Sequence, residues 1–534
     1  MLTEADIIIV GSGASGAAAA WRLSQNSSLK IVCLEQGEHT DASKYPTSSV
    51  DWELKKQTAS NYNPNVRKQV ADYPIDDTQS PISLANYNGF GGSTILYSGH
   101  FPRFHPSDFA TRTLDDIADD WPFGYAELAH YFEQNEQMMG VAGLVGDTAY
   151  PDYHALLPPI PLGPAGEKLA KGFNKLNWHW WPSYSAINTK NHQQRAGCVN
   201  LGPCNTGCTQ GAKGSVDVTY WPEALRHGVT VYTNCHVFDI PLDKQDKATG
   251  VKFLDIEGNA HFIKSHVVIL AASGIGTPRI LLQSKSNRFP NGLLNDYDLV
   301  GRNLMLHPLA YTEAVFDEPL NSSLGPQGCC FLSQQFYETN DAHDFKRGYT
   351  MQVLRGSPAL ETSLTGYLTR KIPLGKNHHK AFSKHFNCNM GIAVISEDLP
   401  ELHNRIELDA LNTNSLGLPG LKVHYQLHEN TKKMLMHGIK RSKEAFEAAG
   451  AKVTNSFSPV KHAGWHLMGT ARMGLDDKSS VVNQHGQAHA VSNLFIVDSS
   501  IFVTSGAVNP VATAQALTLK ICDELSRNIK QWIA

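Results

Sequence analysis

A glycine-rich turn near the start of the chain constrains the fold more than any other feature. Gly11-Ser-Gly-Ala-Ser-Gly16 follows a short apolar run at 6–10 and opens an alanine-rich stretch at 17–23, and a second apolar run spans 29–34. Continuous apolar runs are typical of parallel strands buried on both faces, and alanine favours helix. The sequence therefore predicts a strand, a tight turn, a helix and a second strand, which open a Rossmann-like α/β domain.

The spacing of the three glycines predicts a dinucleotide site. The first glycine permits the tight turn, the second permits close approach of the backbone to a pyrophosphate, and the third permits close packing of helix on strand. The helix N-terminus offers unpaired N–H groups to the phosphates. Glu35 ends the second strand about 20 residues later, where a carboxylate binds a ribose diol and disfavours the 2′-phosphate of NADP. The predicted ligands are Gly11, Gly13, Ala14, Ser15, Gly16 and Glu35.

Length, charge and apolar runs limit the classes of protein. With 534 residues the chain exceeds one simple core, so two or more domains are expected. The net charge of −4 gives no reason to expect nucleic acid or an anionic membrane as partner. No apolar run reaches the roughly 18 residues needed to span a bilayer, and the first residues lead into a strand without a signal peptide. We therefore expect a cytoplasmic protein, or a periplasmic one exported with a partner subunit.

The apolar pattern predicts a discontinuous nucleotide-binding domain. Strand-like runs at 229–233 and 266–271 continue the α/β pattern, and a strand at 494–497 with a long helix at 511–525 returns to it. Residues 309–461 contain alternating strand-like runs instead, which indicate an antiparallel sheet. The predicted fold class is α/β (α+β overall), with a Rossmann-like domain at 1–308 and 462–534, a surface excursion at 40–80, and an inserted substrate-binding domain at 309–461.

Further segments, in order along the chain, resemble one enzyme family. They are Asn88–Thr94, Ala272–Ser284, Val300–His307, Trp465–Gly474 and Val497–Pro510. Together they resemble the glucose–methanol–choline (GMC) oxidoreductases, and the likeness covers essentially the whole chain. Asp120–Tyr125 and Gly207–Lys213 are most similar to bacterial FAD-dependent gluconate, fructose and glucose dehydrogenase subunits and to pyranose-type oxidases. The resemblance implies FAD, and oxidation of a CH–OH group of a sugar, polyol or other alcohol by hydride transfer to the flavin.

The resemblance also implies further contacts with the cofactor. The implied residues are Gly91, Gly92, Ser93, Val237, Asp498, Asn509 and Pro510. Some family members attach FAD covalently through a histidine four residues after the second glycine of the Gly91-Gly92 loop. The matching position in this chain is Leu96. We therefore expect FAD to be held non-covalently.

Two residues are predicted to carry the chemistry. Removal of hydride from an alcohol carbon requires the hydroxyl proton to leave as well, and a histidine within hydrogen-bond reach is an efficient base near neutral pH. His466 lies where the family has its catalytic histidine, and Asn509 lies where the family has a second histidine or an asparagine. An amide can donate a hydrogen bond to a developing alkoxide without titrating. We predict His466 as the base and Asn509 as its neighbour.

A further histidine and two glutamates are alternative candidates for site residues. His462 precedes His466 by four residues, a spacing that on a helix would suit two metal ligands, but Gly464 favours a loop and no third ligand is near in sequence. We therefore expect no metal. Some steroid-oxidising relatives use a glutamate base, but Glu397 and Glu401 cannot be placed in the site from sequence. We expect both of them at the surface.

Cys198, Cys204 and Cys208 form the one cluster among nine cysteines. Some FAD-dependent sugar dehydrogenases carry an iron–sulfur cluster on a loop of this pattern, with two adjacent cysteines at its start. Here Val199 follows Cys198, so one expected thiolate ligand is missing. Loop thiols or a disulfide are favoured over a cluster, and the odd count favours a reducing compartment.

Three functional hypotheses remain open at this point. The first is a flavin-dependent alcohol or sugar oxidoreductase, acting as a dehydrogenase with a quinone or cytochrome as electron acceptor, or as an oxidase using oxygen. The second is an NAD-dependent dehydrogenase built on the same βαβ unit. The third is a flavoprotein whose cofactor is structural. The motifs beyond residue 80, with both His466 and Asn509, favour the first. A small partner subunit is compatible with it.

Overall fold

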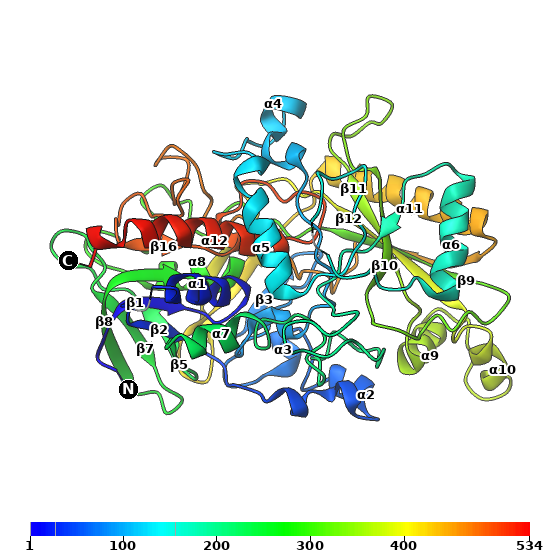
Figure 1. The fold of residues 1–534 in the computed structure, drawn as a ribbon, viewed down its shortest axis with the longest axis horizontal. Helices are drawn as coiled ribbons and strands as arrows, with labels where there is room; N and C mark the ends of the chain where they lie inside the picture. Colours follow the sequence, from blue (N-terminus) through cyan, green and yellow to red (C-terminus); the bar gives the residue numbers. More distant parts are fainter. Residues whose placement is uncertain (1, 27, 155, 534) are drawn as a thin grey trace.

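The computed structural model describes residues 2–26, 28–154 and 156–533. The sequence predicts no signal peptide at the start of the chain, and Met1 lies outside the described residues. In Figure 1 the first sheet lies on the left and the second on the right. Both described ends of the chain lie beside the first sheet. The two sheets and the segments between them position the candidate site.

The first sheet has seven strands in the order β5-β2-β1-β8-β7-β6, with β16 paired to β8. Its strands are β1 (Glu4–Val10), β2 (Ile31–Leu34), β5 (Thr230–Tyr232), β6 (His236–Asp239), β7 (Gly250–Leu254), β8 (Ala260–Leu270) and β16 (Leu494–Ile496). Strand β1 lies parallel between β2 and β8, with Ile7 opposite Ile31 and Val267. Because β1 is flanked by strands and covered by helices, Ile7 to Ile9 are fully buried. The predicted Rossmann-like sheet is confirmed.

Helices cover this sheet where the sequence is rich in small and apolar residues. They include α1 (Ala14–Ser24), α5 (Ala129–Met139), α7 (Tyr220–Arg226), α8 (Ser273–Gln283) and α12 (Val511–Arg527). The alanines at 17–20 are fully buried, and these short side chains let α1 pack closely against α7 and α12. The chain returns through β16 and α12 to this domain, as the apolar pattern predicted.

The second sheet is antiparallel and has six strands in the order β15-β9-β12-β11-β10-β4. Its strands are β4 (Trp181–Pro182), β9 (Leu309–Val315), β10 (Cys329–Phe336), β11 (Tyr349–Leu354), β12 (Asn389–Ser396) and β15 (Lys452–Phe457). Helices α6 (Gly163–Lys175) and α11 (Glu429–Ala449) pack together over one face (Figure 1). Met351, Val353 and Ile392 belong to the core beneath these helices. The predicted antiparallel sheet is confirmed.

Some segments of the predicted Rossmann-like domain pack with strands of the predicted substrate-binding domain. Helix α6 and strand β4 lie within residues 1–308 but pack with the second sheet. A third sheet joins β13 (Arg405–Thr413) and β14 (Pro419–His424) to β3 (Ile75–Gln79), from the stretch expected as a surface excursion. These pairings join segments from both sides of the predicted boundaries. The division at 308 and 462 stays a prediction.

Short helices complete the molecule. They are α2 (Trp52–Lys56), α3 (Pro64–Arg67), α4 (Thr111–Asp115), α9 (Ala359–Leu368) and α10 (His378–Ser383). Helices α2 and α3 lie within the 40–80 stretch, which is therefore folded and partly buried, with Tyr45 and Tyr73 in the interior. Among the described residues, no helix combines the length and apolar character needed to cross a membrane.

Candidate active site

The glycine-rich turn lies between β1 and α1, as predicted. A Cβ atom at Gly11 would lie 2.6 Å from the carbonyl oxygen of Ala271, and one at Gly16 would lie 1.9 Å from the carbonyl oxygen of Gly11. Side chains cannot be accommodated at either position without movement of the backbone. The indole nitrogen of Trp221 donates to the Ser12 carbonyl at 2.8 Å. The turn is thus held in place, and it leaves the α1 N-terminus, at Ala14 and Ser15, as a set of backbone donors suited to phosphate.

The Gly91-Gly92 loop lies directly on this turn. A Cβ atom at Gly92 would lie 2.6 Å from the Cα of Gly13, so two backbones meet where no side chain fits. The Gly91 N–H donates to the Ser12 hydroxyl at 3.2 Å. Two segments about 80 residues apart thus form one cradle of backbone atoms, which suits the close approach that a pyrophosphate requires. Both belong to the predicted cofactor-binding set.

Glu35 lies at the end of β2 beside the same turn. Its buried carboxylate accepts hydrogen bonds from the Ser12 N–H at 2.9 Å, the Ser12 hydroxyl at 2.7 Å and the Gly37 N–H at 2.9 Å. Burial raises the pKa of Glu35, while these donors lower it. A carboxylate offers about four lone-pair sites. A ribose diol would be a further neutral donor, so these residues fit the adenosine half of FAD.

The other predicted cofactor contacts lie around the same cradle. Val237 is buried in β6, two residues after Cys235, whose N–H donates to the Glu35 carbonyl. Asp498 is buried after β16 and accepts from the Ser273 N–H at the start of α8. Ser93 is exposed on the Gly91-Gly92 loop. Pro510 is the N-cap of α12, next to Asn509. These roles toward FAD stay predictions.

The two predicted catalytic residues are brought together. The Nε2 atom of His466 lies 3.2 Å from the side-chain nitrogen of Asn509. The Nδ1 atom of His466 lies 2.9 Å from Nδ1 of His307, which sequence reasoning did not single out as a site residue. Gln352 on β11 donates to the side-chain oxygen of Asn509. Four side chains from four segments distant in sequence thus form one hydrogen-bonded row.

The row fixes which nitrogen of His466 is free to accept a proton. His307 Nε2 lies 2.9 Å from the Ser505 carbonyl and 2.8 Å from the Gly506 carbonyl, so it must be the N–H donor. In a neutral ring, His307 Nδ1 is then an acceptor, and His466 Nδ1 must donate to it. His466 Nε2 is left with its lone pair, facing the amide of Asn509. This inferred tautomer is the one required of a general base.

Burial keeps the imidazoles in this region neutral. Burial, and then the charges of His307 and His100, lower the pKa of His466 well below its ordinary value. Burial lowers the pKa of His307 to about 4 and that of His100 to about 3. A neutral His466 at pH 7 is a competent proton acceptor. His307 also has a φ of 52°, an uncommon conformation outside glycine that tends to occur at functional sites.

His100 is the second residue that the sequence did not single out. It is near enough to influence the pKa of His466, it is 4% exposed, and its Nδ1 lies 2.7 Å from the Ser183 hydroxyl. Its Nε2 is buried and has no hydrogen-bond partner among the described residues. The Thr350 hydroxyl, two residues before Gln352 on β11, is also buried without a partner there. Such atoms are costly to leave unpaired, which favours a ligand as their partner.

The expectation that Glu397 is at the surface is wrong. Glu397 is 1% exposed, and its carboxylate accepts from the Arg347 guanidinium at 2.8 Å. Arg347 also pairs with the buried Asp108, which accepts from the Tyr337 hydroxyl at 2.7 Å. Burial raises the pKa of Glu397 to about 7. The buried arginine draws the carboxylates inside, an ionic pairing that a polar sequence stretch does not reveal.

The three clustered cysteines are free thiols in the structure, as are the other six. Burial raises the pKa of Cys204 to about 12 and also raises that of Cys198. The buried amine of Lys213 donates to the Cys204 carbonyl at 2.8 Å and so holds the loop. Within the described ranges, no group of three His, Cys, Asp or Glu side chains is arranged to hold a metal.

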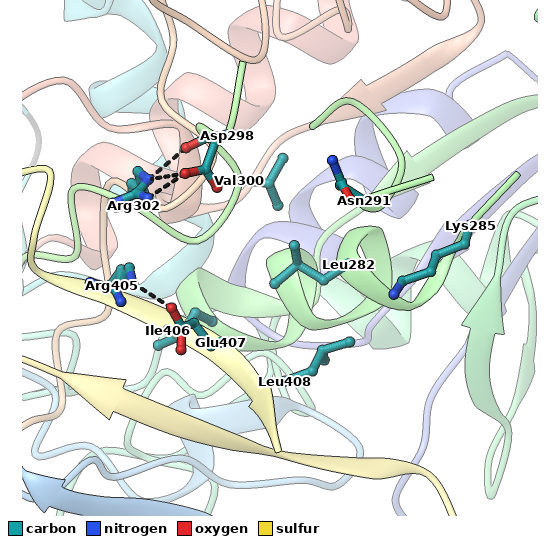
Figure 2. A pocket seen from close by; sticks show the side chains of 10 residues that line it. All are labelled: Leu282, Lys285, Asn291, Asp298, Val300, Arg302, Arg405, Ile406, Glu407 and Leu408. Atoms are coloured by element: carbon teal, nitrogen blue, oxygen red, sulfur yellow. Dashed lines mark hydrogen bonds and ion pairs between the residues drawn. The ribbon is translucent and has the colours of Figure 1, made fainter. Parts of the chain in front are cut away.

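A surface pocket of about 190 Å³ lies between α8 and β13 (Figure 2). Arg302 in this pocket pairs with Asp298, and Arg405 pairs with Glu407 at 2.6 Å. None of its lining residues belongs to the predicted site. The pocket therefore carries no functional argument.

Comparison with known proteins agrees with this geometry. Models of the GMC oxidoreductase family match residues 5–309 (N-terminal part) and 400–518 (C-terminal part). The 2-methyl-1,2-propanediol dehydrogenase of Mycolicibacterium austroafricanum is 38% identical over 98% of this chain and 95% of its own. The fructose dehydrogenase large subunit of Gluconobacter japonicus is 26% identical over 99% of both chains.

Solved structures agree on the fold. Pyridoxine 4-oxidase from Mesorbium loti matches with a TM-score of 0.68 at 17% identity, over 98% of this chain and 99% of its own. The family models and the 38% identical relative confirm the resemblance noted in the sequence over nearly the whole chain, and the NAD-dependent hypothesis is set aside. The chain belongs to the GMC oxidoreductase family and is an FAD-dependent oxidoreductase that acts on CH–OH groups.

Proposed function

We propose that the protein oxidises a small polyol or vicinal diol to the carbonyl, with His466 as the base and FAD held non-covalently. The observation that carries the proposal is the contact of His466 Nε2 with Asn509, with His466 Nδ1 engaged by His307. The base is thus set in one orientation and one tautomer before substrate arrives.

The cradle around Gly13 and Gly92, the α1 N-terminus and Glu35 would hold the pyrophosphate and ribose of FAD. Bound FAD supplies the acceptor for the hydride that leaves the substrate carbon. Leu96 has no group that could bond the flavin, which supports non-covalent attachment.

The residues of the chain would manage the proton. The substrate hydroxyl would donate to His466 Nε2, which takes its proton as the carbon loses hydride, and the C–O bond becomes the carbonyl. The Asn509 amide, oriented by Gln352, would donate to the oxygen as negative charge develops on it. An imidazolium formed at His466 in this step would keep its Nδ1–H bond to His307.

The substrate class is inferred from two buried polar atoms that have no hydrogen-bond partner among the described residues. One belongs to His100, close to His466, and the other lies on β11, two residues before Gln352. A neutral imidazole nitrogen at His100 and a hydroxyl at Thr350 suit hydroxyl groups of the substrate other than the one oxidised. The most similar relative described above has a vicinal diol in its name, and the next has a sugar. Both point to a substrate with more than one hydroxyl group.

For the electron acceptor we propose a quinone or cytochrome, because both relatives are named dehydrogenases. An oxidase that uses oxygen is the alternative. Steady-state turnover with oxygen and with a quinone or dye acceptor separates the two. Comparable rates with oxygen would overturn the assignment as a dehydrogenase.

The test of the proposed function is an anaerobic screen of flavin bleaching with vicinal diols, sugars, sterols and simple monohydric alcohols. Diols and polyols should bleach the flavin fastest. The variant His100→Phe should lose rate on diols but not on the matching monohydric alcohols. A preference for monohydric alcohols in the parent enzyme would contradict the substrate class, and bleaching by none of them would contradict the proposed activity.

A further inference from the structure

We propose that the segment of residues 359–387, between β11 and β12, is a docking surface for an anionic lipid membrane. The segment contains α9 and α10, which lie at one extremity of the molecule, at the lower right of Figure 1. The proposal does not depend on the identity of the substrate or on His466. The net charge of the whole chain gives no reason to expect an anionic membrane as partner, but one segment can still be basic.

Helix α9 presents its apolar side to solvent. Leu364, Tyr367 and Leu368 are 48%, 50% and 71% exposed, and Leu374, just beyond the helix, is 68% exposed. The spacing of Leu364, Tyr367 and Leu368 places them on one face of a helix. In a surface helix of a globular protein, such a stripe normally faces the core.

The inner side of α9 is built from small and polar residues instead. Thr362 and Gly366 are buried, and a Cβ atom at Gly366 would lie 2.4 Å from Ile372 Cδ1. The Thr362 hydroxyl donates to the Ser357 carbonyl at 3.0 Å. The helix is therefore docked on the protein through its small face, and rotating the leucines inward would break this close packing.

Positive charge is concentrated in the same segment as the exposed apolar stripe. The cationic residues of the segment are Arg370, Lys371, Lys376, Lys380 and Lys384, accompanied by His378, His379 and His385. All five Lys and Arg residues are exposed, and in the part of the chain that the structure describes they form no ion pair. The one acidic residue between positions 359 and 387, Glu361, is paired with Lys56 at 3.7 Å. The segment is thus basic in a chain of net charge −4.

The apolar surface continues onto a neighbouring helix. The Glu53 carboxylate in α2 accepts from the Leu360 N–H at 2.9 Å, which joins α2 to α9. Val50 and Leu54, beside Glu53, are exposed. Helix α2 lies on the same lower edge of the molecule as α9 in Figure 1. Exposed apolar side chains therefore gather from two segments about 300 residues apart in sequence.

Leucine and tyrosine side chains exposed on a projecting helix, in one segment with lysines that pair with no acid among the described residues, match the chemistry of an anionic bilayer surface. The apolar side chains would enter the interface, and the cations would lie among the lipid headgroups. A protein partner would need a groove with acidic walls to cover the same features. The projecting helices and the excess of positive charge favour the lipid surface, which accepts a convex apolar ridge without such a groove.

The experiment is sedimentation of the FAD-loaded enzyme with vesicles of phosphatidylcholine alone or of phosphatidylcholine mixed with phosphatidylglycerol. The enzyme should sediment with the anionic vesicles, and binding should weaken as salt is raised. Leu364→Ser with Leu368→Ser should abolish sedimentation. Lys380→Gln with Lys384→Gln should weaken it by about tenfold or more, because each cation near an anionic surface contributes.

Matched controls separate the patch from general effects. Leu411→Ser removes an exposed leucine on β13, and Lys440→Gln with Lys443→Gln removes two exposed lysines on α11; both should bind like the parent. Every variant should keep its flavin spectrum and soluble turnover. Failure of the parent enzyme to bind anionic vesicles would overturn the proposal. So would a lipid-free dimer, seen by analytical ultracentrifugation, that the leucine variants abolish, because the patch would then join two copies of the chain.

Discussion

The Nδ1 atom of His307 lies 2.9 Å from the Nδ1 atom of His466, and the other nitrogen of His307 contacts two backbone carbonyls. Two rings joined nitrogen to nitrogen can hold only one proton between them while both are neutral. Because the carbonyls require the N–H at His307 Nε2, that proton belongs to His466. The identity of the free nitrogen on the candidate base is thus set by the residue that contacts its other nitrogen.

The variant His307→Leu tests this positioning role. It removes the acceptor for the His466 N–H, so flavin reduction should slow by about 10- to 100-fold, by analogy with metal-binding imidazoles that lose the partner orienting them. At the acidic end of the pH–rate profile His307 becomes protonated, and its charge then lowers the pKa of His466, so in the variant the acidic limb should move to higher pH. Stopped-flow reduction across pH measures both effects. His462→Leu, which changes an exposed histidine nearby, should alter neither.

The buried cluster around Arg347 predicts a large effect on stability. Arg347→Met would leave the carboxylates of Asp108 and Glu397 buried without their cation, which typically costs about 3–5 kcal/mol of unfolding free energy. Arg288→Met, which breaks a partly exposed pair with Asp296, should cost about 0–1 kcal/mol. Urea unfolding of the two variants and the parent checks the contrast. Equal losses would mean that the cluster is not the buried ionic centre described above.

The cofactor should separate from the protein on acid precipitation. Leu96 occupies the position at which some relatives carry the bonding histidine, and a leucine side chain cannot form that bond. After precipitation, the supernatant should contain intact FAD and the pellet should be colourless. A yellow pellet would point to covalent attachment through another residue.

The cysteine loop should hold no iron–sulfur cluster. Val199 stands where the cluster-bearing relatives have a second cysteine. Protein made and purified anaerobically should contain no stoichiometric iron or acid-labile sulfide. About three irons per chain, the content of a cluster held by Cys198, Cys204 and Cys208, would contradict this prediction and would imply electron transfer onward to a partner.

The local features of the fold could be predicted because each is encoded in a short segment. The turn at Gly11–Gly16, the strand predicted at 266–271 and the helix predicted at 511–525 depend on neighbouring residues, and the structure confirms them. The contact of His307 with His466 joins residues 159 positions apart. No spacing rule predicts such a contact, because it depends on how two sheets pack.

The features that the sequence did not reveal depend on partners that are distant in the chain. Strand β4 has two residues, too few for a periodic pattern, and its place beside β10 is set by the partner strand. Glu397 lies in a polar stretch that reads as surface until Arg347 is brought beside it. His100 gives no sequence signal, since only its burial and its unpaired nitrogen mark it.

The central claim is that neutral His466 takes the hydroxyl proton, and anaerobic stopped-flow flavin reduction across pH tests it most directly. In the parent enzyme the rate should rise with pH through one transition below the ordinary histidine range, because burial lowers the pKa of His466. His466→Ala should keep its FAD, slow reduction by roughly 10²–10⁴ and lose the transition. Asn509→Ala should be slower but keep it, since an amide does not titrate. Reduction of His466→Ala at the parent rate with an unchanged pH profile would contradict the account.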